Sequence, residues 1–165
     1  LDRLNLRGDE RILDLGCGRG AVLLLAAQHL TTGRAVGVDL WRRVDQSGNS
    51  PEATRRNALA EGVADRVELH TADMTALPFG DNSFDVIVSS MAIHNISGRA
   101  GRERAVREAV RVLRPGGRLL IADVRGTRPH QAQLAKIGMN EVTGRRLRWP
   151  FMARLVTATK PDDRS

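Results

Sequence analysis

The sequence has one cysteine, no tyrosine and no long apolar run. With Cys17 alone the chain cannot form an internal disulfide, which excludes a disulfide-stapled secreted scaffold. The longest apolar run, residues 21–27, has seven residues, whereas a membrane-spanning helix needs about 20. No signal peptide is visible. We therefore expect a globular protein of the cytoplasm, with no membrane span in this chain.

The length and composition fit one domain. The chain has 165 residues and a mass of 18.1 kDa, with 41% apolar and 27% charged residues. These proportions are ordinary for a folded protein and argue against disorder. A domain of this size buries about 70% of the surface that its unfolded chain exposes, so it needs no staple. We expect one domain over residues 1–165 and no metal site. Because the first residue is Leu1 rather than Met, we expect a fragment or a trimmed chain.

The net charge is +7, and arginine supplies almost all of the positive charge. Of the 26 basic residues, only Lys136 and Lys160 are lysine. A basic balance favours an anionic partner such as nucleic acid. However, aromatic residues make up only 3% of the chain, and proteins that bind single strands stack the bases on aromatic side chains. Because the arginines are spread along the whole chain, we interpret the charge mainly as a solvated surface.

Short apolar runs alternate with helical patterns along the chain. Strands are predicted over residues 11–15, 35–39, 67–71, 84–89 and 118–123. Helices are predicted over residues 20–30, 102–113 and 131–137, and between an N-cap at Ser50, with Pro51 at the first helical position, and Gly62 just past the end. Apolar strands separated by helices predict a doubly wound α/β fold, with a mostly parallel sheet covered by helices on both faces. Two further extended stretches, residues 142–149 and 152–159, are close enough to pair antiparallel at one edge.

Aspartates recur where the predicted strands end. Asp14, Asp39, Asp73 and Asp123 lie at the end of a strand or directly beyond it. The carboxyl ends of parallel strands share one edge of the sheet, where open α/β sheets bind their ligands. Each aspartate alone could equally be a helix cap or a turn residue. Their joint recurrence favours a binding site at that edge.

A glycine-rich loop, with glycines at positions 16, 18 and 20, joins the first strand to the first helix. Glycines there permit positive φ and close approach of a ligand to the backbone, and the helix N-terminus offers free N–H groups. Gly16, Gly18 and Ala21 also satisfy the dinucleotide pattern, so a nicotinamide enzyme is an alternative. However, the negative charge of Asp14 before the loop would repel a pyrophosphate and suits a cationic ligand. The chain also has no room for the substrate domain of a nicotinamide enzyme.

Six short motifs follow one another in a specific order. They are ILDLGCGRG at residues 12–20, VGVD at 36–39, AD at 72–73, LPF at 77–79, FDVIVSSMAIHNI at 84–96 and VLRPGGRLLIAD at 112–123. In order and spacing they resemble the class I S-adenosylmethionine-dependent methyltransferases. The likeness is greatest to the small-molecule branch typified by the ubiquinone/menaquinone-biosynthesis C-methyltransferases, and it covers residues 11–160. This resemblance implies a Rossmann-like fold with a reversed edge hairpin at the C-terminus, S-adenosylmethionine as cofactor, and methyl transfer to a small-molecule acceptor.

The resemblance further implies how the glycine loop would hold the cofactor. Gly16, Gly18 and Gly20 would line its methionine end, and Asp14 would lie near its amino group. Cys17 would sit in the same loop as a small residue. A nucleophilic role for this thiol has no support, because no partner base is adjacent in the sequence.

The same resemblance places five residues at the nucleoside end. Asp39 would accept hydrogen bonds from both ribose hydroxyls, and Leu40 and Trp41 would pack beside the adenine. Asp73 would accept a hydrogen bond from the adenine amino group, and Met74 would present its backbone N–H to the ring.

Two residues after the fourth strand complete the predicted site. By the resemblance, Ser90 would hold the amino-acid moiety of the cofactor through its backbone. His94 is our candidate general base, because it follows this strand on the ligand edge and histidine titrates near neutral pH. A packing or capping role for His94 is the alternative. Further substrate-side candidates on this edge are Asn95, Asp123, Arg125 and His130.

The sequence leaves the substrate open. Few residues precede the first strand, and only about a dozen separate Asp123 from Ile137, where relatives carry segments that cover the active site. We therefore expect an open site, a site completed by another segment, or a partner-bound substrate. Two other functions stay open: an RNA methyltransferase, and a module that binds the cofactor without catalysis.

Overall fold

Seven strands form one sheet in the computed structural model, which describes residues 4–42, 44, 47–147 and 153–162. The strands are β1 (Arg11–Leu15), β2 (Arg34–Asp39), β3 (Val67–Thr71), β4 (Phe84–Ser90), β5 (Leu113–Asp123), β6 (Asn140–Arg146) and β7 (Arg154–Thr159). Their order in the sheet is β3-β2-β1-β4-β5-β7-β6. The first five strands pair in parallel, and β7 pairs antiparallel with both β5 and β6. The predicted parallel sheet with an antiparallel C-terminal edge is confirmed.

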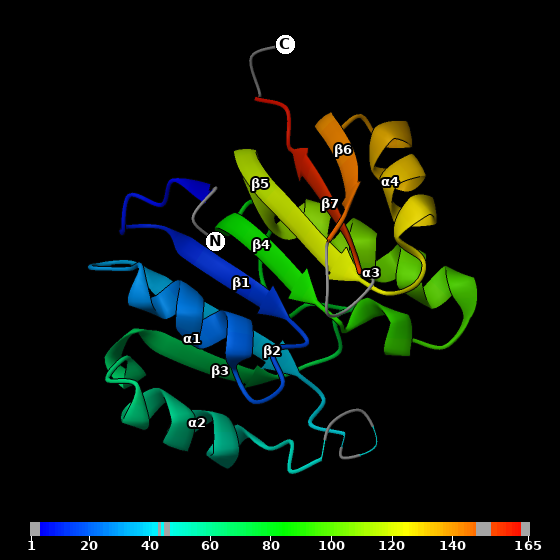
Figure 1. Ribbon diagram of the computed structural model, residues 1–165. Helices are drawn as coiled ribbons and strands as arrows, with labels where there is room; N and C mark the ends of the chain where they lie inside the picture. The colour runs from blue at the N-terminus through cyan, green and yellow to red at the C-terminus, as the bar shows by residue number, and fades with distance from the viewer. Residues whose placement is uncertain (1–3, 43, 45–46, 148–152, 163–165) are drawn as a thin grey trace.

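Four α-helices flank the sheet. They are α1 (Ala21–Gln28), α2 (Pro51–Ala60), α3 (Gly98–Val112) and α4 (Thr127–Lys136), and two short 3₁₀ turns are η2 (Ala64–Arg66) and η3 (Ile93–Asn95). Helix α2 starts as predicted, because the Ser50 side chain accepts a hydrogen bond from the Ala53 N–H and Pro51 occupies the first turn. Figure 1 shows α1 and α2 on one face of the sheet and α3 and α4 on the other.

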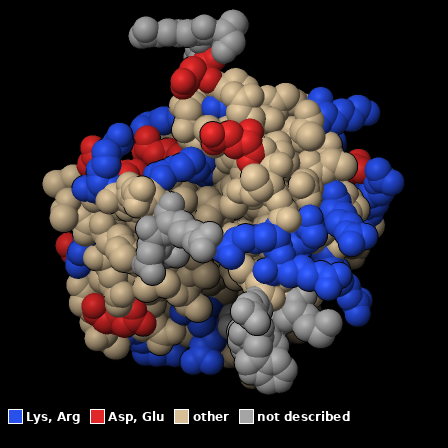
Figure 2. Space-filling view, turned by 45° about the horizontal axis from the view of Figure 1, so that its top comes forward, with Lys and Arg blue, Asp and Glu red and all other residues tan. Residues whose placement is uncertain are grey.

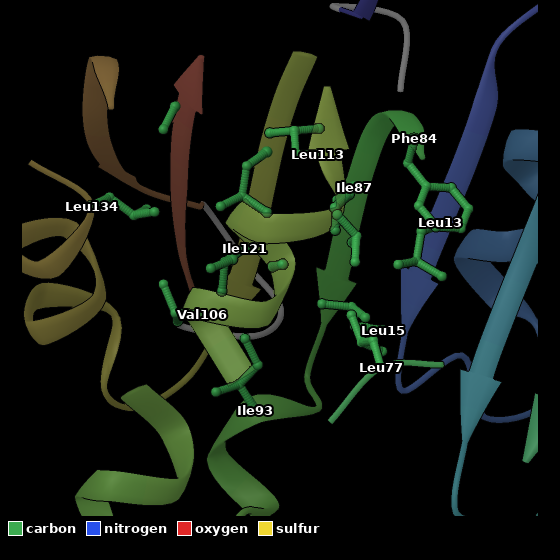
Figure 3. Close-up of a cluster of buried hydrophobic side chains, with 14 of the residues drawn as sticks. Leu13, Leu15, Leu77, Phe84, Ile87, Ile93, Val106, Leu113, Ile121 and Leu134 are labelled. Carbon is green, nitrogen blue, oxygen red and sulfur yellow. The ribbon is translucent and has the colours of Figure 1, made fainter. Parts of the chain in front are cut away.

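The core has one layer on each face, because side chains of a strand point alternately to the two faces. Leu13 and Leu15 of β1 pack toward α3 and α4, together with Val106 and Leu134 of those helices. Figure 3 shows this layer between the sheet and the helices. Ile12, between the two leucines, belongs instead to the layer under α1. The buried layers hold the carboxyl ends of the parallel strands in register at one edge.

Two helices start earlier than the sequence patterns predict. Helix α3 begins at Gly98 rather than at residue 102. The sequence pattern misses this first turn because Gly98 and Gly101 have a low helix propensity. Gly101 faces Ile96 so closely that a Cβ would lie 2.7 Å from the Ile96 Cγ2. Helix α4 begins at Thr127 rather than at residue 131, since Pro129 fits a first turn whose N–H groups need no partner.

The last strands also differ in their bounds from the prediction. Strand β5 starts at Leu113 rather than at residue 118, and residues 115–117 lie inside it as an irregularity, with Gly116 at a φ of 70°. The predicted strands over residues 142–149 and 152–159 correspond to β6 and β7. Residues 148, 149 and 152 of those predictions lie outside the described residues.

No helix among the described residues is long and apolar enough to cross a membrane.

Candidate functional site

A cavity of about 400 Å³ opens at the carboxyl ends of β1, β2 and β4. This volume is in the range of small-ligand sites, and the location is the one expected for an open α/β sheet. Nine of the predicted cofactor-binding residues line it: Asp14, Gly16, Cys17, Gly18, Asp39, Leu40, Asp73, Met74 and Ser90. Gly20, Trp41 and His94 are not among its described lining residues. The fold therefore brings most of the predicted set together around one space.

The glycine loop forms the floor of the cavity beside η3. Gly16 and Gly18 have φ values of 73° and 51°, which a residue with a side chain rarely adopts. A Cβ on Gly16 would lie only 2.3 Å from the Cβ of Ala92. Gly20 has a φ of 94° and is the N-cap of α1, so it shapes the loop from outside the cavity. These glycines leave backbone rather than side chains facing the space.

Asp14 lines the cavity with a buried carboxylate. Its relative exposure is 1%, and neither carboxylate oxygen has a hydrogen-bond partner of ordinary geometry among the described residues. Burial raises the pKa of Asp14 to about 7; the Leu23 backbone partly offsets this rise, and the nearby charge of Asp39 adds to it. A buried, unpaired carboxylate is costly unless a cation satisfies it, so Asp14 fits a ligand with a cationic group at this end.

Asp39 organises the loops around the second strand. Its carboxylate accepts hydrogen bonds from the backbone N–H groups of Gly18 at 2.9 Å and of Trp41 at 2.6 Å, and from the Asn49 side chain at 3.2 Å. A carboxylate oxygen can accept more than one hydrogen bond, so capacity for a ligand donor remains. Trp41 has a φ of 57°, and its indole N–H donates to the Thr71 hydroxyl at 2.8 Å. The indole is thus held on β3, next to the cavity wall rather than in it.

Asp73 and Met74 form the wall after β3. The Asp73 carboxylate accepts a hydrogen bond from the Thr75 N–H at 2.8 Å and stays exposed. The Met74 side chain reaches toward Gly16, since its Cε lies 3.2 Å from the position of a Gly16 Cβ. This wall therefore closes over the glycine loop from the β3 side.

His94 lies beside the cavity, in η3, against a buried carboxylate. Its Nδ1 is 2.7 Å from Oδ1 of Asp123, and its backbone N–H donates to Oδ2 of Asp123 at 3.1 Å. Asp123 ends β5 with an exposed fraction of 1%, whereas the His94 side chain is 25% exposed. The sequence suggests both residues separately, but no local pattern indicates that they pair. Asn95, the next residue, lines the cavity.

His130, another substrate-side candidate, is buried near Asp123 on α4. Its exposed fraction is 2%, and neither ring nitrogen has a hydrogen-bond partner among the described residues. Burial lowers the pKa of His130, partly against the charge of Asp123. Burial thus favours the neutral ring, which lies outside the described lining of the cavity. Arg125, in the loop after β5, is exposed.

Cys17 is a packing residue of the loop. It is buried, and burial raises the pKa of its thiol, so the thiol stays protonated and unreactive. The described residues contain no cluster of three His, Cys, Asp or Glu side chains that could hold a metal ion.

Helix α2 braces the glycine loop, which the sequence patterns do not reveal. The Thr54 hydroxyl donates to the Gly18 carbonyl at 2.7 Å, and the Asn57 side chain donates to the Arg19 carbonyl at 2.9 Å. With Asn49 on Asp39, three polar side chains around α2 fix the loop. No sequence motif marks these three residues. Thr54 and Asn57 bond to backbone carbonyls more than 30 residues away, and Asn49 bonds to the side chain of Asp39.

The comparisons with known proteins agree with this geometry. Residues 13–121 match the family described as a methyltransferase domain. The chain is 40% identical over 128 residues to the methyltransferase GfsG of Streptomyces halstedii, covering 76% of this chain and 42% of GfsG. It is 35% identical over 123 residues to the ubiquinone/menaquinone biosynthesis C-methyltransferase UbiE of Roseobacter denitrificans, covering 74% of this chain and 46% of UbiE. The chain thus spans less than half the length of these relatives.

The fold also matches solved structures. The crystal structure of the [4+2]-cyclase SpnF superimposes with a TM-score of 0.78 at 19% identity, over 95% of this chain and 77% of SpnF. At this identity the likeness shows the fold alone. Because SpnF is a cyclase, the fold by itself does not determine the reaction. The family match, the motif order and the glycine loop with its strand-end aspartates agree, and the chain belongs to the S-adenosylmethionine-dependent methyltransferases, in the methyltransferase-domain family.

Proposed function

We propose that this chain binds S-adenosylmethionine in the cavity and transfers its methyl group to a small molecule. The observation that carries the proposal is the Asp14 carboxylate, which is buried at the glycine loop with no hydrogen-bond partner of ordinary geometry in the described part of the chain. The cofactor carries an ammonium group at its methionine end, and such a group would satisfy Asp14. Gly16 and Gly18 would admit that end, and Asp39 would accept from the ribose hydroxyls.

The nucleoside end would lie between β2 and β3. Leu40, 41% exposed on the cavity wall, offers an apolar surface for the adenine. Asp73 would accept from the adenine amino group and Met74 would donate its N–H. Trp41 would act indirectly, because its indole supports this wall from the Thr71 side.

We further propose His94 as the general base, positioned by Asp123. When bound, S-adenosylmethionine supplies an activated methyl group on its sulfonium and leaves as S-adenosylhomocysteine. Acceptor binding beside η3 would align the acceptor atom with the methyl carbon, an effect that can contribute about 7–11 kcal/mol. Nε2 of His94 would take the proton that the acceptor atom loses when the methyl group is transferred to it from the sulfur. Asp123, 2.7 Å from Nδ1, stabilises the positive charge that this proton brings to the ring.

We also propose that residues 1–165 act as one unit and that the protein works in the cytoplasm. One sheet contains all strands of the described residues, which supports the first statement. A single buried cysteine needs no oxidising compartment, which supports the second.

The test is calorimetric titration with S-adenosylhomocysteine, followed by mass-spectrometric detection of methylated products from a panel of hydroxylated small molecules. We expect saturable one-site binding. We also expect a product that is about 14 Da heavier than its acceptor, because methylation replaces one hydrogen with a methyl group. Absence of cofactor binding would refute the proposal. Binding without transfer to any acceptor would favour a module that holds the cofactor without catalysis.

A further inference from the structure

The net charge of the chain comes from its C-terminal part. Residues 124–161 contain eight basic residues and one acidic residue, whereas the remaining residues contain 18 of each. The arginines are spread along the whole chain, whereas the aspartates and glutamates that balance them lie almost entirely outside residues 124–161. The whole excess of +7 therefore lies in the segment that forms α4, β6 and β7.

Four exposed arginines of this segment lie at the edge of the sheet that carries the cavity. Arg125 follows the carboxyl end of β5, Arg128 is in the first turn of α4, and Arg145 and Arg146 end β6. Because β7 pairs antiparallel with both neighbours, β6 runs in the direction of β5 and ends at the same edge. We call these four residues the arginine group. Figure 2 shows Lys and Arg side chains gathered on the side that carries α4 and β6 in Figure 1.

The arginine group has no charge partner within the described residues. The structure gives their side chains no ion pair and no hydrogen bond with another described residue. Some arginines elsewhere are engaged: Arg111 bonds to Glu108 and Asp81, and Arg114 bonds to Asp85. Glu141, the one acidic residue of the segment, lies at the opposite end of β6, where its carboxylate accepts from Thr159. The guanidinium groups are thus available to an anion from outside.

The arginine group begins next to the His94–Asp123 pair. Arg125 is two residues beyond Asp123, and Arg154 of β7 lies opposite Asp123 in the sheet and opposite Arg146 on its other side. Side chains alternate along a strand, so Arg146 projects to the same face of the sheet as Asp123 and Arg154, whereas Arg145 projects to the other face. An acceptor whose reacting atom lies at His94 would extend on that shared face toward Arg125, Arg128 and Arg146. Guanidinium groups bind carboxylates and phosphates through paired hydrogen bonds, which favours arginine over lysine for this purpose.

We propose that the methyl acceptor is a small anion, and that Arg125, Arg128 and Arg146 of the arginine group bind its carboxylate or phosphate while the reacting atom lies at His94. This inference rests on the proposed function and names the substrate class for that site. A nucleic acid is the less favoured occupant, because aromatic residues make up only 3% of the chain and proteins that bind single strands stack the bases on aromatic side chains. Four arginines at one corner also suit a compact anion better than a long strand.

The experiment compares acceptors that differ only in charge. S-adenosylhomocysteine is titrated first, and the saturated protein is then titrated with 3,4-dihydroxybenzoate and its neutral amide, and with 3-hydroxydecanoate and its amide. We expect at least one acid to bind about tenfold more tightly than its amide, the effect of hydrogen bonds to a charged group. The preference should disappear in the double variant Arg125→Gln/Arg146→Gln. It should persist in Arg56→Gln/Arg107→Gln, which removes two exposed arginines from α2 and α3 and changes the net charge equally.

The outcomes separate this inference from the proposed function. Failure of S-adenosylhomocysteine to bind would overturn the proposed function, and the inference with it. If that titration succeeds and neither acid binds better than its amide, only the anion proposal is overturned. Equal loss of the preference in both double variants would also overturn it, since net charge rather than the arginine group would then be responsible. Binding of a labelled oligouridylate with steep salt dependence, not displaced by the acids, would assign the arginines to RNA instead.

Discussion

Over β1, β2 and β3 the carboxyl edge of the sheet carries aspartates, whereas over β5 and β6 the same edge carries exposed arginines around the buried Asp123. The acidic half is defined by Asp14, Asp39 and Asp73, which line the cavity together with Arg19, Arg42 and Arg104. The basic half is the arginine group, which lies outside the cavity's described lining. Strand β4, between the halves, leads to η3 and His94. The difference indicates two ligands of opposite charge that meet at the junction, a cationic cofactor on one side and an anionic acceptor on the other.

The two halves also differ in how firmly the protein holds them. Asp39 accepts three hydrogen bonds from the protein, and α2 braces the glycine loop through Thr54. The arginine group has exposed side chains with no such contacts in the described structure. A preorganised half suits a constant ligand, and a less constrained half suits an acceptor that varies among relatives.

The largest expected effect is at the junction. His94→Gln should lower the rate of methyl transfer by about 10²–10⁴-fold, because general-base catalysis contributes that much. Affinity for S-adenosylhomocysteine should stay unchanged, since the described cavity lining does not include His94. Single-turnover rates and calorimetry measure the two quantities. The control is His29→Gln, an exposed residue at the end of α1. A His94→Gln variant with the wild-type rate would mean that the acceptor loses no proton to this ring.

The second prediction concerns Asp14 in the acidic half and its effect on the free energy of unfolding of the ligand-free protein. The folded-state pKa of Asp14 is raised from 3.8 to about 7, so the folded state binds its proton more tightly than the unfolded state does. Ionisation of Asp14 therefore lowers the free energy of unfolding progressively as pH rises from about 4 to about 7. Asp14→Asn should remove this loss, and above pH 7 it should be more stable than wild type by on the order of 4 kcal/mol.

Affinity should change in the opposite direction. Asp14→Asn should weaken binding of S-adenosylhomocysteine, because the ammonium group loses its carboxylate. In the wild type that affinity should fall as pH drops below about 7, and in the variant it should not. Urea unfolding and calorimetry across the pH range provide both data sets, with the exposed Asp65→Asn as control. Equal free energies of unfolding for wild type and Asp14→Asn at every pH would show that the buried carboxylate does not destabilise the folded protein.

Much of the fold follows from local patterns. Apolar strands of β-branched residues predict β1 to β4 almost to the residue, and Ser50 with Pro51 fixes the start of α2. The predicted starts of α3 and α4 are wrong, because glycine and proline can either interrupt a helix or occupy its first turn. Gly98 and Pro129 read as interruptions, yet both fit the first turn of a helix, where their backbone requires few hydrogen bonds.

The site is less predictable than the fold. The glycine loop and strand-end aspartates are sequence signals, because their backbone and charge requirements are local. The His94–Asp123 pair joins residues 29 positions apart, and only the sheet register brings them within 2.7 Å. The same holds for Trp41, whose indole is turned toward Thr71 by a positive φ that no motif specifies. Contacts made through tertiary structure carry no local pattern.

A smaller effect should follow from changing the ribose contact. Asp39→Ala should cost about 1–3 kcal/mol of affinity for S-adenosylhomocysteine, by removing an acceptor for buried hydroxyls. The loss should shrink for the 2′,3′-dideoxy analogue, which has no hydroxyls to donate. A loss of the same size for both ligands would instead indicate that Asp39 acts through Gly18 and Trp41, by holding the loops.

The smallest expected effect tests whether the two halves are independent. In Asp39→Ala/Arg145→Gln, the changes in free energy of S-adenosylhomocysteine binding should add to within about 0.3–0.5 kcal/mol, as for distant sites without shared partners. Strand order supports this expectation, because β1, β4, β5 and β7 separate β2 from β6. Arg145→Gln alone should change that affinity by less than about 0.5 kcal/mol. A larger coupling, in calorimetry at low and high salt, would mean that the arginines already act on the cofactor through the field of the whole edge. In that case the charge division would serve cofactor binding rather than the choice of acceptor.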